Sequence, residues 1–176
     1  GKNFESLREM NEMIREGKVK KYYNALVKGR IKDGLYTGYI SKNENEKMYP
    51  ASTTKILTAI LTLENSNLDD VVTASYDSVM SIPDGYSTAN IQIGEQLTVE
   101  QLLQMLLVHS ANDAANILAE HVGGSIDSFV SMMNTKLNEL GLYDSHFTNT
   151  YGKHDENHYT TAADLAKLAQ YCMKNS

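Results

Sequence analysis

The sequence is poor in the features that mark several common kinds of protein. It contains a single cysteine, Cys172, so no internal disulfide can form, and the apolar stripe around it favours a small buried side chain. No apolar run approaches the roughly 18 residues of a membrane-spanning helix. Its 16 basic residues are outnumbered by 22 acidic ones and form no cluster with interleaved aromatics. We therefore expect no membrane span in this chain and no nucleic-acid partner.

The length and the composition predict one domain, with room for no more than a small satellite. In the first part of the chain, apolar residues at helical spacing between Phe4 and Ile14 predict a helix. Asp33-Gly34 then lies between two tracts rich in tyrosine, valine and isoleucine, which predicts a hairpin. With 41% hydrophobic residues, the 176-residue chain can build one core but is short for two.

Helices dominate the prediction for the rest of the chain. Apolar residues leave little polar face between Ser52 and Glu64, which predicts a mostly buried helix. Four further apolar stretches carry capping or stop signals. They predict helices from the Thr98 cap through Val108, over 114–122, from the Ser125 cap to Leu140, and from the Thr161 cap through Cys172. The tracts 65–94 and 142–159 lack such periodicity and are interpreted as loops, the first with short regular pieces.

The first of these helices begins with a serine and a lysine three residues apart. At that spacing Ser52 and Lys55 project from one helix face, as a nucleophile and its base must. A serine hydroxyl is unreactive at neutral pH unless a base takes its proton, and burial lowers a lysine pKa towards a useful range. Such a pair also occurs by chance in many proteins. Its place in a buried helix, where an unpaired lysine is costly, favours the catalytic interpretation.

A second polar group, Ser110-Ala111-Asn112, interrupts two apolar helices. The Ser110 hydroxyl could relay a proton, and the Asn112 carboxamide could hold a substrate amide. The alternative is that Ser110 or Asn112 only caps a neighbouring helix, which is the commoner use of these residue types at such a position. In combination with Ser52 and Lys55, the group favours a catalytic site.

Three stretches together resemble the low-molecular-weight penicillin-binding proteins, which are serine D-Ala-D-Ala carboxypeptidases. They are residues 49–59 (YPASTTKILTA), 109–116 (HSANDAAN) and 154–162 (HDENHYTTA). Their order and spacing agree with the family, and the resemblance extends from Asn43 to Asn175. It implies a β-lactamase/transpeptidase-like α+β fold, of which this chain would hold mainly the helical portion, with an N-terminal hairpin and an incomplete sheet. By the same resemblance, residues 42–176 would form a partial catalytic domain, and residues 1–41 would be an atypical helix and hairpin before it.

The resemblance also implies a role for each candidate residue. Ser52 would attack the carbonyl between the two D-alanines of a peptidoglycan pentapeptide, Lys55 would accept its proton, and Ser110 would pass a proton to the leaving D-alanine. Asn112 would hold the substrate amide, and water would hydrolyse the acyl-enzyme. β-Lactams would inhibit by acylating the same serine, and no cofactor is implied. An enzyme of the cell wall is expected to be extracytoplasmic, with its signal peptide absent from this chain.

The chain departs from the family at both ends. The family's third motif, Lys-Thr-Gly or a close variant, does not follow Ser110, so the cation for the substrate carboxylate and the second oxyanion donor are not found. We therefore expect impaired turnover by this chain alone, unless a partner chain supplies the missing strands. The alternative is an inactive, truncated or chimeric folding unit. For residues 1–41, a divergent family hairpin and a fusion to another protein both stay open.

Two other chemistries fit parts of the sequence. His154 and His158, flanked by Asp155 and Glu156, could bind zinc, but a spacing of four residues has no fixed geometry in a loop. A serine β-lactamase or esterase would use the same Ser52, but nothing resembles an added deacylating glutamate. The resemblance favours the carboxypeptidase, without a metal site.

Overall fold

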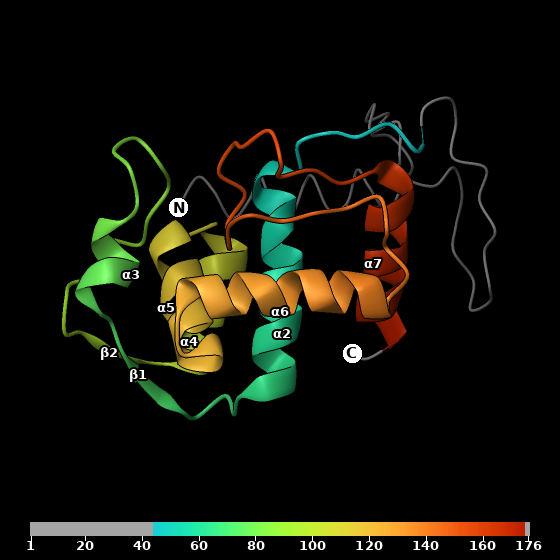
Figure 1. The fold of residues 1–176 in the computed structure, drawn as a ribbon. Coiled ribbons are helices and arrows are strands. Elements are labelled where there is room, and N and C mark those ends of the chain that lie inside the picture. Colours follow the sequence, from blue (N-terminus) through green and yellow to red (C-terminus); the bar gives the residue numbers. More distant parts are fainter. Residues whose placement is uncertain (1–43, 175–176) are drawn as a thin grey trace, which may run out of the picture. The chain divides into compact units, whose positions relative to one another are not determined.

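The computed structural model describes residues 44–174, which belong to one compact unit formed by residues 43–176. This part is mainly helical (Figure 1). Its elements in chain order are the 3-10 turn η1 (Ala51–Thr53), α2 (Thr54–Asn65), β1 (Val71–Thr73), α3 (Tyr76–Met80), β2 (Gln96–Thr98), α4 (Val99–Val108), α5 (Asn112–Gly123), α6 (Ile126–Glu139) and α7 (Ala162–Lys174). The helix and hairpin predicted in residues 1–41 lie outside the described residues, so they and the division near residue 42 stay predictions.

Helix α2 is one of two central helices in this part of the chain; the other is α5, which contacts α2, α3, α4, α6 and β1. Helix α2 contacts α4, α5 and α6, and Figure 1 shows α6 crossing α2, with α4 and α5 to one side and α7 to the other. Eight of its twelve residues are buried, as its apolar sequence predicts. Two of its buried threonines donate their hydroxyls to backbone carbonyls: Thr58 donates to Thr150 O at 2.6 Å, and Thr62 donates to Thr58 O at 2.8 Å. The helix can therefore be buried without leaving these polar groups unpaired.

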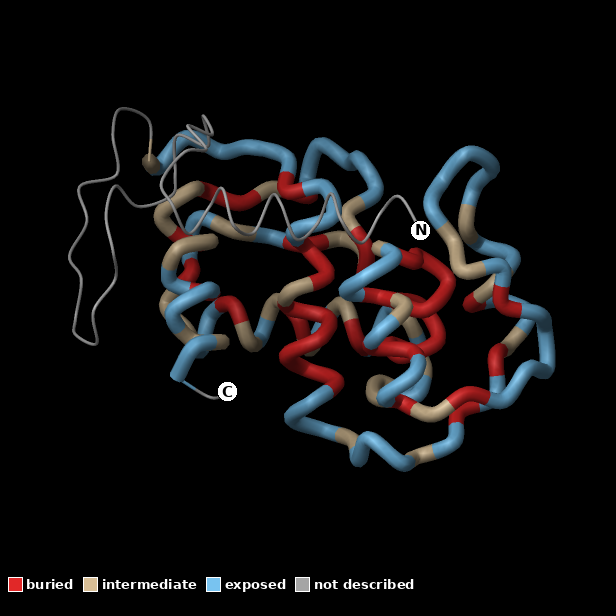
Figure 2. Tube along the Cα trace, turned by 180° about the vertical axis from the view of Figure 1, so that it is seen from behind, coloured by how far each residue is buried: buried red, intermediate tan, exposed pale blue. Residues whose placement is uncertain are grey.

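Two apolar clusters fill the interior of this unit, and Figure 2 shows the buried positions concentrated along the inner helices. One cluster joins α4 and α5 to the β1–β2 side, and the other joins α2, α6 and α7. Full burial of a leucine or phenylalanine contributes roughly 1.5–3 kcal/mol, so these clusters supply the main driving force for packing. Their largest fully buried members include Leu102, Leu106, Ile117 and Leu118 in the first, and Leu57, Phe129, Met133, Phe147 and Leu168 in the second.

The sheet in residues 44–174 is a short antiparallel pair. Strand β1 pairs with β2 in the register Val71–Thr98, Val72–Leu97 and Thr73–Gln96, and Val72 and Leu97 face the core. The tract 65–94 therefore contains the short regular pieces expected of it. Strand β2 leads directly into α4, whose predicted capping box is confirmed: Thr98 Oγ1 accepts from Gln101 N, and Gln101 Oε1 accepts from Thr98 N.

Two helix starts differ from the prediction. Ser52 lies in the 3-10 turn η1, and α2 itself begins at Thr54. Helix α5 begins at Asn112, two residues before the predicted Ala114, because its polar first turn is buried rather than exposed. The Asp113 carboxylate accepts hydrogen bonds from the backbone of the 89–91 loop, from Ala89 N at 3.0 Å and Ile91 N at 3.1 Å. The loop thus supplies hydrogen bonds to Asp113, a residue type that, from the sequence alone, was expected to interrupt the helix.

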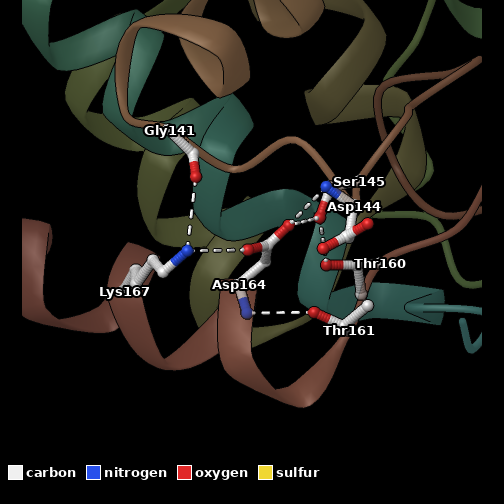
Figure 3. A network of polar contacts seen from close by, with 7 residues as sticks. All are labelled: Gly141, Asp144, Ser145, Thr160, Thr161, Asp164 and Lys167. Atoms are coloured by element: carbon white, nitrogen blue, oxygen red, sulfur yellow. Dashed lines mark hydrogen bonds and ion pairs between the residues drawn. The ribbon is translucent and has the colours of Figure 1, made fainter. Parts of the chain in front are cut away.

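A buried carboxylate ties α7 to the loop that precedes it (Figure 3). Asp164 accepts from Asp144 N at 3.1 Å, from Ser145 Oγ at 2.8 Å and from Lys167 Nζ at 3.3 Å. The predicted cap is confirmed, since Asp164 N donates to Thr161 Oγ1 at 3.1 Å. The preceding Thr160 pairs through its backbone with Met48, at 2.8 and 2.9 Å, which fixes the chain that enters η1. None of the helices in residues 44–174 is long and apolar enough to cross a membrane.

Candidate active site

The turn that carries Ser52 is held in a strained backbone conformation. Ala51 has a φ of +48°, in the left-handed region, which costs a non-glycine residue on the order of 1–3 kcal/mol. Pro50 O closes the turn by accepting from Thr53 N at 3.1 Å and from Thr53 Oγ1 at 2.7 Å. Gly152, with a φ of +92°, lies so close that a Cβ on it would overlap the Ala51 carbonyl. The result is an exposed Ser52 on a fixed turn at the start of α2.

Lys55 lies under this turn with its amine directed at Ser52. Its Nζ is 3.2 Å from Ser52 Oγ and donates to the backbone carbonyl of Tyr151 at 3.1 Å. The side chain is 3% exposed, and no carboxylate forms an ion pair with it among residues 44–174. Burial accordingly lowers the pKa of Lys55 from 10.5 to about 8, the direction and cause expected from the sequence. At pH 7 roughly a tenth of the amine is then neutral and able to accept a proton.

Ser110 reaches the same oxygen from the junction between α4 and α5. Its Oγ donates to Ser52 Oγ at 3.1 Å, and its φ of +59° is again left-handed. The junction is held by the neighbouring loop, since Ser87 Oγ donates to His109 O at 3.1 Å and Ser87 O accepts from Asn112 N at 2.9 Å. Helix α4 ends at Val108 with His109 as its C-cap, and the N-cap of α5 is Ala111, without a side-chain hydrogen bond. The capping interpretation of Ser110 and Asn112 therefore does not fit this junction.

Asn112 occupies the first turn of α5, two residues from Ser110, and is 4% exposed. No hydrogen bond joins its carboxamide to another of the described side chains or carbonyls, and none joins it to Ser52 or Lys55. The structure thus brings three of the four predicted residues into direct contact. The carboxamide of the fourth stays available to a ligand.

The sequence did not indicate that the 149–152 turn would contact Lys55 and position it. Asn149 Oδ1 accepts from Gly152 N at 2.8 Å and Lys153 N at 2.9 Å, and this closes the turn that presents the Tyr151 carbonyl. An Asn followed three residues later by Gly is a turn signal, but it does not reveal which distant side chain the turn will meet.

The cluster interpreted as a possible zinc site is dispersed in the structure. Among residues 44–174 no three histidine, cysteine or carboxylate side chains lie close enough to hold a metal ion. His154 instead packs its ring edge-on to Tyr49, with centroids 4.4 Å apart. His158 is buried, and both of its ring nitrogens already have protein partners.

Comparison with known proteins gives consistent matches over most of the chain. A family model described as D-alanyl-D-alanine carboxypeptidase matches residues 35–176. The D-alanyl-D-alanine carboxypeptidase DacF of Bacillus subtilis is 38% identical over 138 residues, which are 76% of this chain and 35% of that protein. The D-alanyl-D-alanine carboxypeptidase of Streptomyces sp. strain K15 is 35% identical over 156 residues, or 83% of this chain and 53% of that one.

Solved structures agree. Penicillin binding protein 6B from Escherichia coli superposes with a TM-score of 0.71 at 31% identity, covering 76% of this chain and 44% of that chain. The Streptomyces K15 DD-transpeptidase gives 0.70 at 35% identity, covering 75% and 54%. The fold expected from the sequence is therefore confirmed, as its mainly helical portion with an incomplete sheet. The chain spans about a third to a half of the length of the curated relatives named above.

Proposed function

This chain belongs to the D-alanyl-D-alanine carboxypeptidase family, and we propose that it carries the acylating half of a serine D-Ala-D-Ala carboxypeptidase. The observation that carries the proposal is the convergence on Ser52 Oγ of the Lys55 amine at 3.2 Å and the Ser110 hydroxyl at 3.1 Å. A desolvated amine with no carboxylate partner in the described part of the chain, next to an exposed hydroxyl on a strained turn, is the arrangement of an activated nucleophile. We assign residues 42–176 to this catalytic unit and leave 1–41 as a separate segment.

The geometry supports a defined order of proton transfers. With one N–H of Lys55 donated to Tyr151 O, the lone pair of the neutral amine can take the Ser52 proton. The Ser52 oxygen then adds to the carbonyl between the two D-alanines, and the negative charge forms beside the N-terminal end of α2. Ser110 passes the proton from Lys55 to the departing D-alanine nitrogen as the C–N bond breaks. Asn112 donates its amide to the peptide, and water hydrolyses the Ser52 ester.

The identity of the acyl acceptor decides between hydrolysis and transfer. The Streptomyces relative is called a carboxypeptidase in one comparison and a DD-transpeptidase in another. Both reactions share the acyl-enzyme, and they differ only in whether water or an amine attacks it. The contacts around Ser52 serve the acylation step in either case, so DD-transpeptidation is the second candidate.

We propose that the 176-residue chain taken by itself turns over poorly. No Lys-Thr-Gly motif or close variant lies between Ser110 and Ser176, and the loss of one oxyanion donor typically costs on the order of 100- to 1000-fold in rate. A strained β-lactam would still acylate Ser52 slowly, because ring opening needs less assistance than amide cleavage. A partner chain could supply the missing strands. We also propose an extracytoplasmic location, because the expected substrate, a peptidoglycan peptide ending in D-Ala-D-Ala, belongs to the cell wall.

Fluorescent penicillin provides the test of this function. The purified 176-residue chain is incubated with the label beside Ser52→Ala and beside Ser128→Ala, which removes an exposed serine of α6. We expect labelling of the wild type and of Ser128→Ala, and none of Ser52→Ala. D-Alanine release from a diacyl-D-Ala-D-Ala peptide should be low in all three. Absence of labelling in the wild type would contradict the proposed function, and robust D-alanine release would contradict the proposed impairment.

A further inference from the structure

His158 lies buried between the helix that carries Lys55 and the turn that faces Lys55. It is 1% exposed and stacks on Phe147, with ring centroids 4.8 Å apart and planes 9° apart. Its Nε2 is 2.8 Å from Thr54 Oγ1, in the first turn of α2. Its Nδ1 faces the loop at Thr148 and Asn149. One imidazole thus bridges two segments that are separated by about a hundred residues of sequence.

The partners of His158 select one protonation form. The backbone N–H of Thr148 donates to Nδ1 at 3.0 Å, and Asn149 Nδ2 donates to the same atom at 3.2 Å. Because Nδ1 accepts, the ring hydrogen sits on Nε2 and is donated to Thr54 Oγ1. Protonation of Nδ1 would turn it into a donor facing these two donors, and only the Thr148 hydroxyl, at 3.3 Å, could then accept from it. Burial lowers the pKa of His158 to about 4, against a smaller opposing effect of Asp155 and with a further lowering by His146, so the neutral form holds at neutral pH.

The bridge continues from His158 to the carbonyl that contacts Lys55. The Asn149 amide that donates to His158 also donates to Lys153 O at 2.9 Å. The Oδ1 of Asn149 accepts from Gly152 N at 2.8 Å, which fixes the turn whose Tyr151 carbonyl receives Lys55 Nζ. On the other side, Thr54 is adjacent to Lys55 in α2. The Lys55 amine and the Tyr151 carbonyl are therefore both positioned by residues that are hydrogen-bonded to the His158 ring.

We propose that His158 is a positioning residue for the base: through Thr54 and Asn149 it holds the first turn of α2 against the 149–152 turn, so that Lys55 stays enclosed between Ser52 and the Tyr151 carbonyl. The inference rests on the proposed function, because it concerns the same lysine. It assigns a role to His158, which the sequence pattern had suggested only as a metal ligand. It also explains how a lysine without a carboxylate partner stays buried, since the turn that covers it is fixed from both sides.

The test measures the pKa of Lys55 directly, by NMR of its side-chain Cε and Nζ resonances in the 176-residue chain, so it does not depend on activity. His158→Leu keeps an apolar side chain against Phe147 and removes the hydrogen bonds to Thr54, Thr148 and Asn149. His158→Gln retains a hydrogen bond at each end, because its carbonyl oxygen can accept from Thr148 N while its amide donates to Thr54. His121→Gln changes a distant histidine of α5 whose partner is Asp70, and serves as the control.

We expect His158→Leu to raise the pKa of Lys55 by at least one unit towards 10.5, because a loosened turn admits water and desolvation is what lowers it. Water replaces the Tyr151 carbonyl as acceptor, so losing that contact does not offset the rise. The His158→Gln and His121→Gln values should stay near the wild-type value. If His158→Leu does not fold, Thr54→Val removes the other end of the bridge and should raise the pKa in the same direction.

A folded His158→Leu with an unchanged Lys55 pKa would overturn the proposal, and if only Thr54→Val folds, an unchanged value in that variant would do the same. A merely structural histidine would lower stability without moving this pKa. Labelling by fluorescent penicillin is run in parallel. A wild type that shows the lowered Lys55 pKa but no labelling contradicts the proposed function and not the positioning role.

Discussion

Replacement of Lys55 by methionine should make the folded chain more stable at pH 7. Burial lowers the lysine pKa from 10.5 to about 8, and each pKa unit corresponds to about 1.4 kcal/mol, so the buried ammonium costs about 3 kcal/mol. Methionine fills a similar volume without that cost but loses the hydrogen bond to Tyr151 O, worth about 1 kcal/mol. We therefore expect Lys55→Met to raise the free energy of unfolding by about 2 kcal/mol at pH 7, while abolishing acylation.

The stability difference between the wild type and Lys55→Met should depend on pH in a defined direction. Between pH 8 and pH 10.5 the unfolded chain binds more protons at Lys55 than the folded chain does, so wild-type stability rises with pH in that window. The advantage of Lys55→Met should shrink over the same window. Urea denaturation of both chains at a series of pH values measures it, and the difference between them cancels the other titrating groups. An equal or lower stability of Lys55→Met at pH 7, or a difference independent of pH, would refute the reasoning.

Two further changes test how the site is held. Gly152→Ala should destabilise the chain by at least about 2 kcal/mol more than Gly94→Ala in urea denaturation, because both glycines have positive φ but only at Gly152 would a Cβ overlap backbone, the Ala51 carbonyl. Equal losses would show that the close approach to Ala51 is relieved without cost. Asp164→Ala should cost about 3 kcal/mol by the same assay, since Asp144 N and Ser145 Oγ lose their acceptor (Figure 3). A loss under about 1 kcal/mol would mean that water replaces the carboxylate.

Local signals account for what the sequence predicts well. The Thr98–Gln101 capping box, the Ser125 cap and the Thr161 cap each act within four residues, and all three are confirmed. The burial of Lys55 also follows from local sequence, because the helix in whose first turn it lies has little polar face. The proximity of Ser52 and Lys55 is likewise set by helical spacing.

Long-range pairs account for what the sequence does not predict. Lys55 meets the Tyr151 carbonyl across 96 residues, and Thr54 meets His158 across 104, with no periodicity or spacing to indicate either contact. Backbone strain at Ala51 is imposed by tertiary packing, so an alanine there gives no warning of it. The three-residue strands β1 and β2 are too short to show an alternating pattern. These contacts, this strain and this strand pairing depend on which distant segments pack together in the folded chain.

The central claim, that Ser52 is the nucleophile, is tested most directly by locating a penicillin adduct. Intact mass of the 176-residue chain after prolonged incubation with benzylpenicillin, followed by proteolysis and peptide mapping, identifies the acylated residue. We expect a single added penicillin, on the peptide that contains Ser52, and no adduct on Ser52→Ala. An adduct on Ser110 or on another side chain, or no adduct on the folded wild type, would contradict that claim.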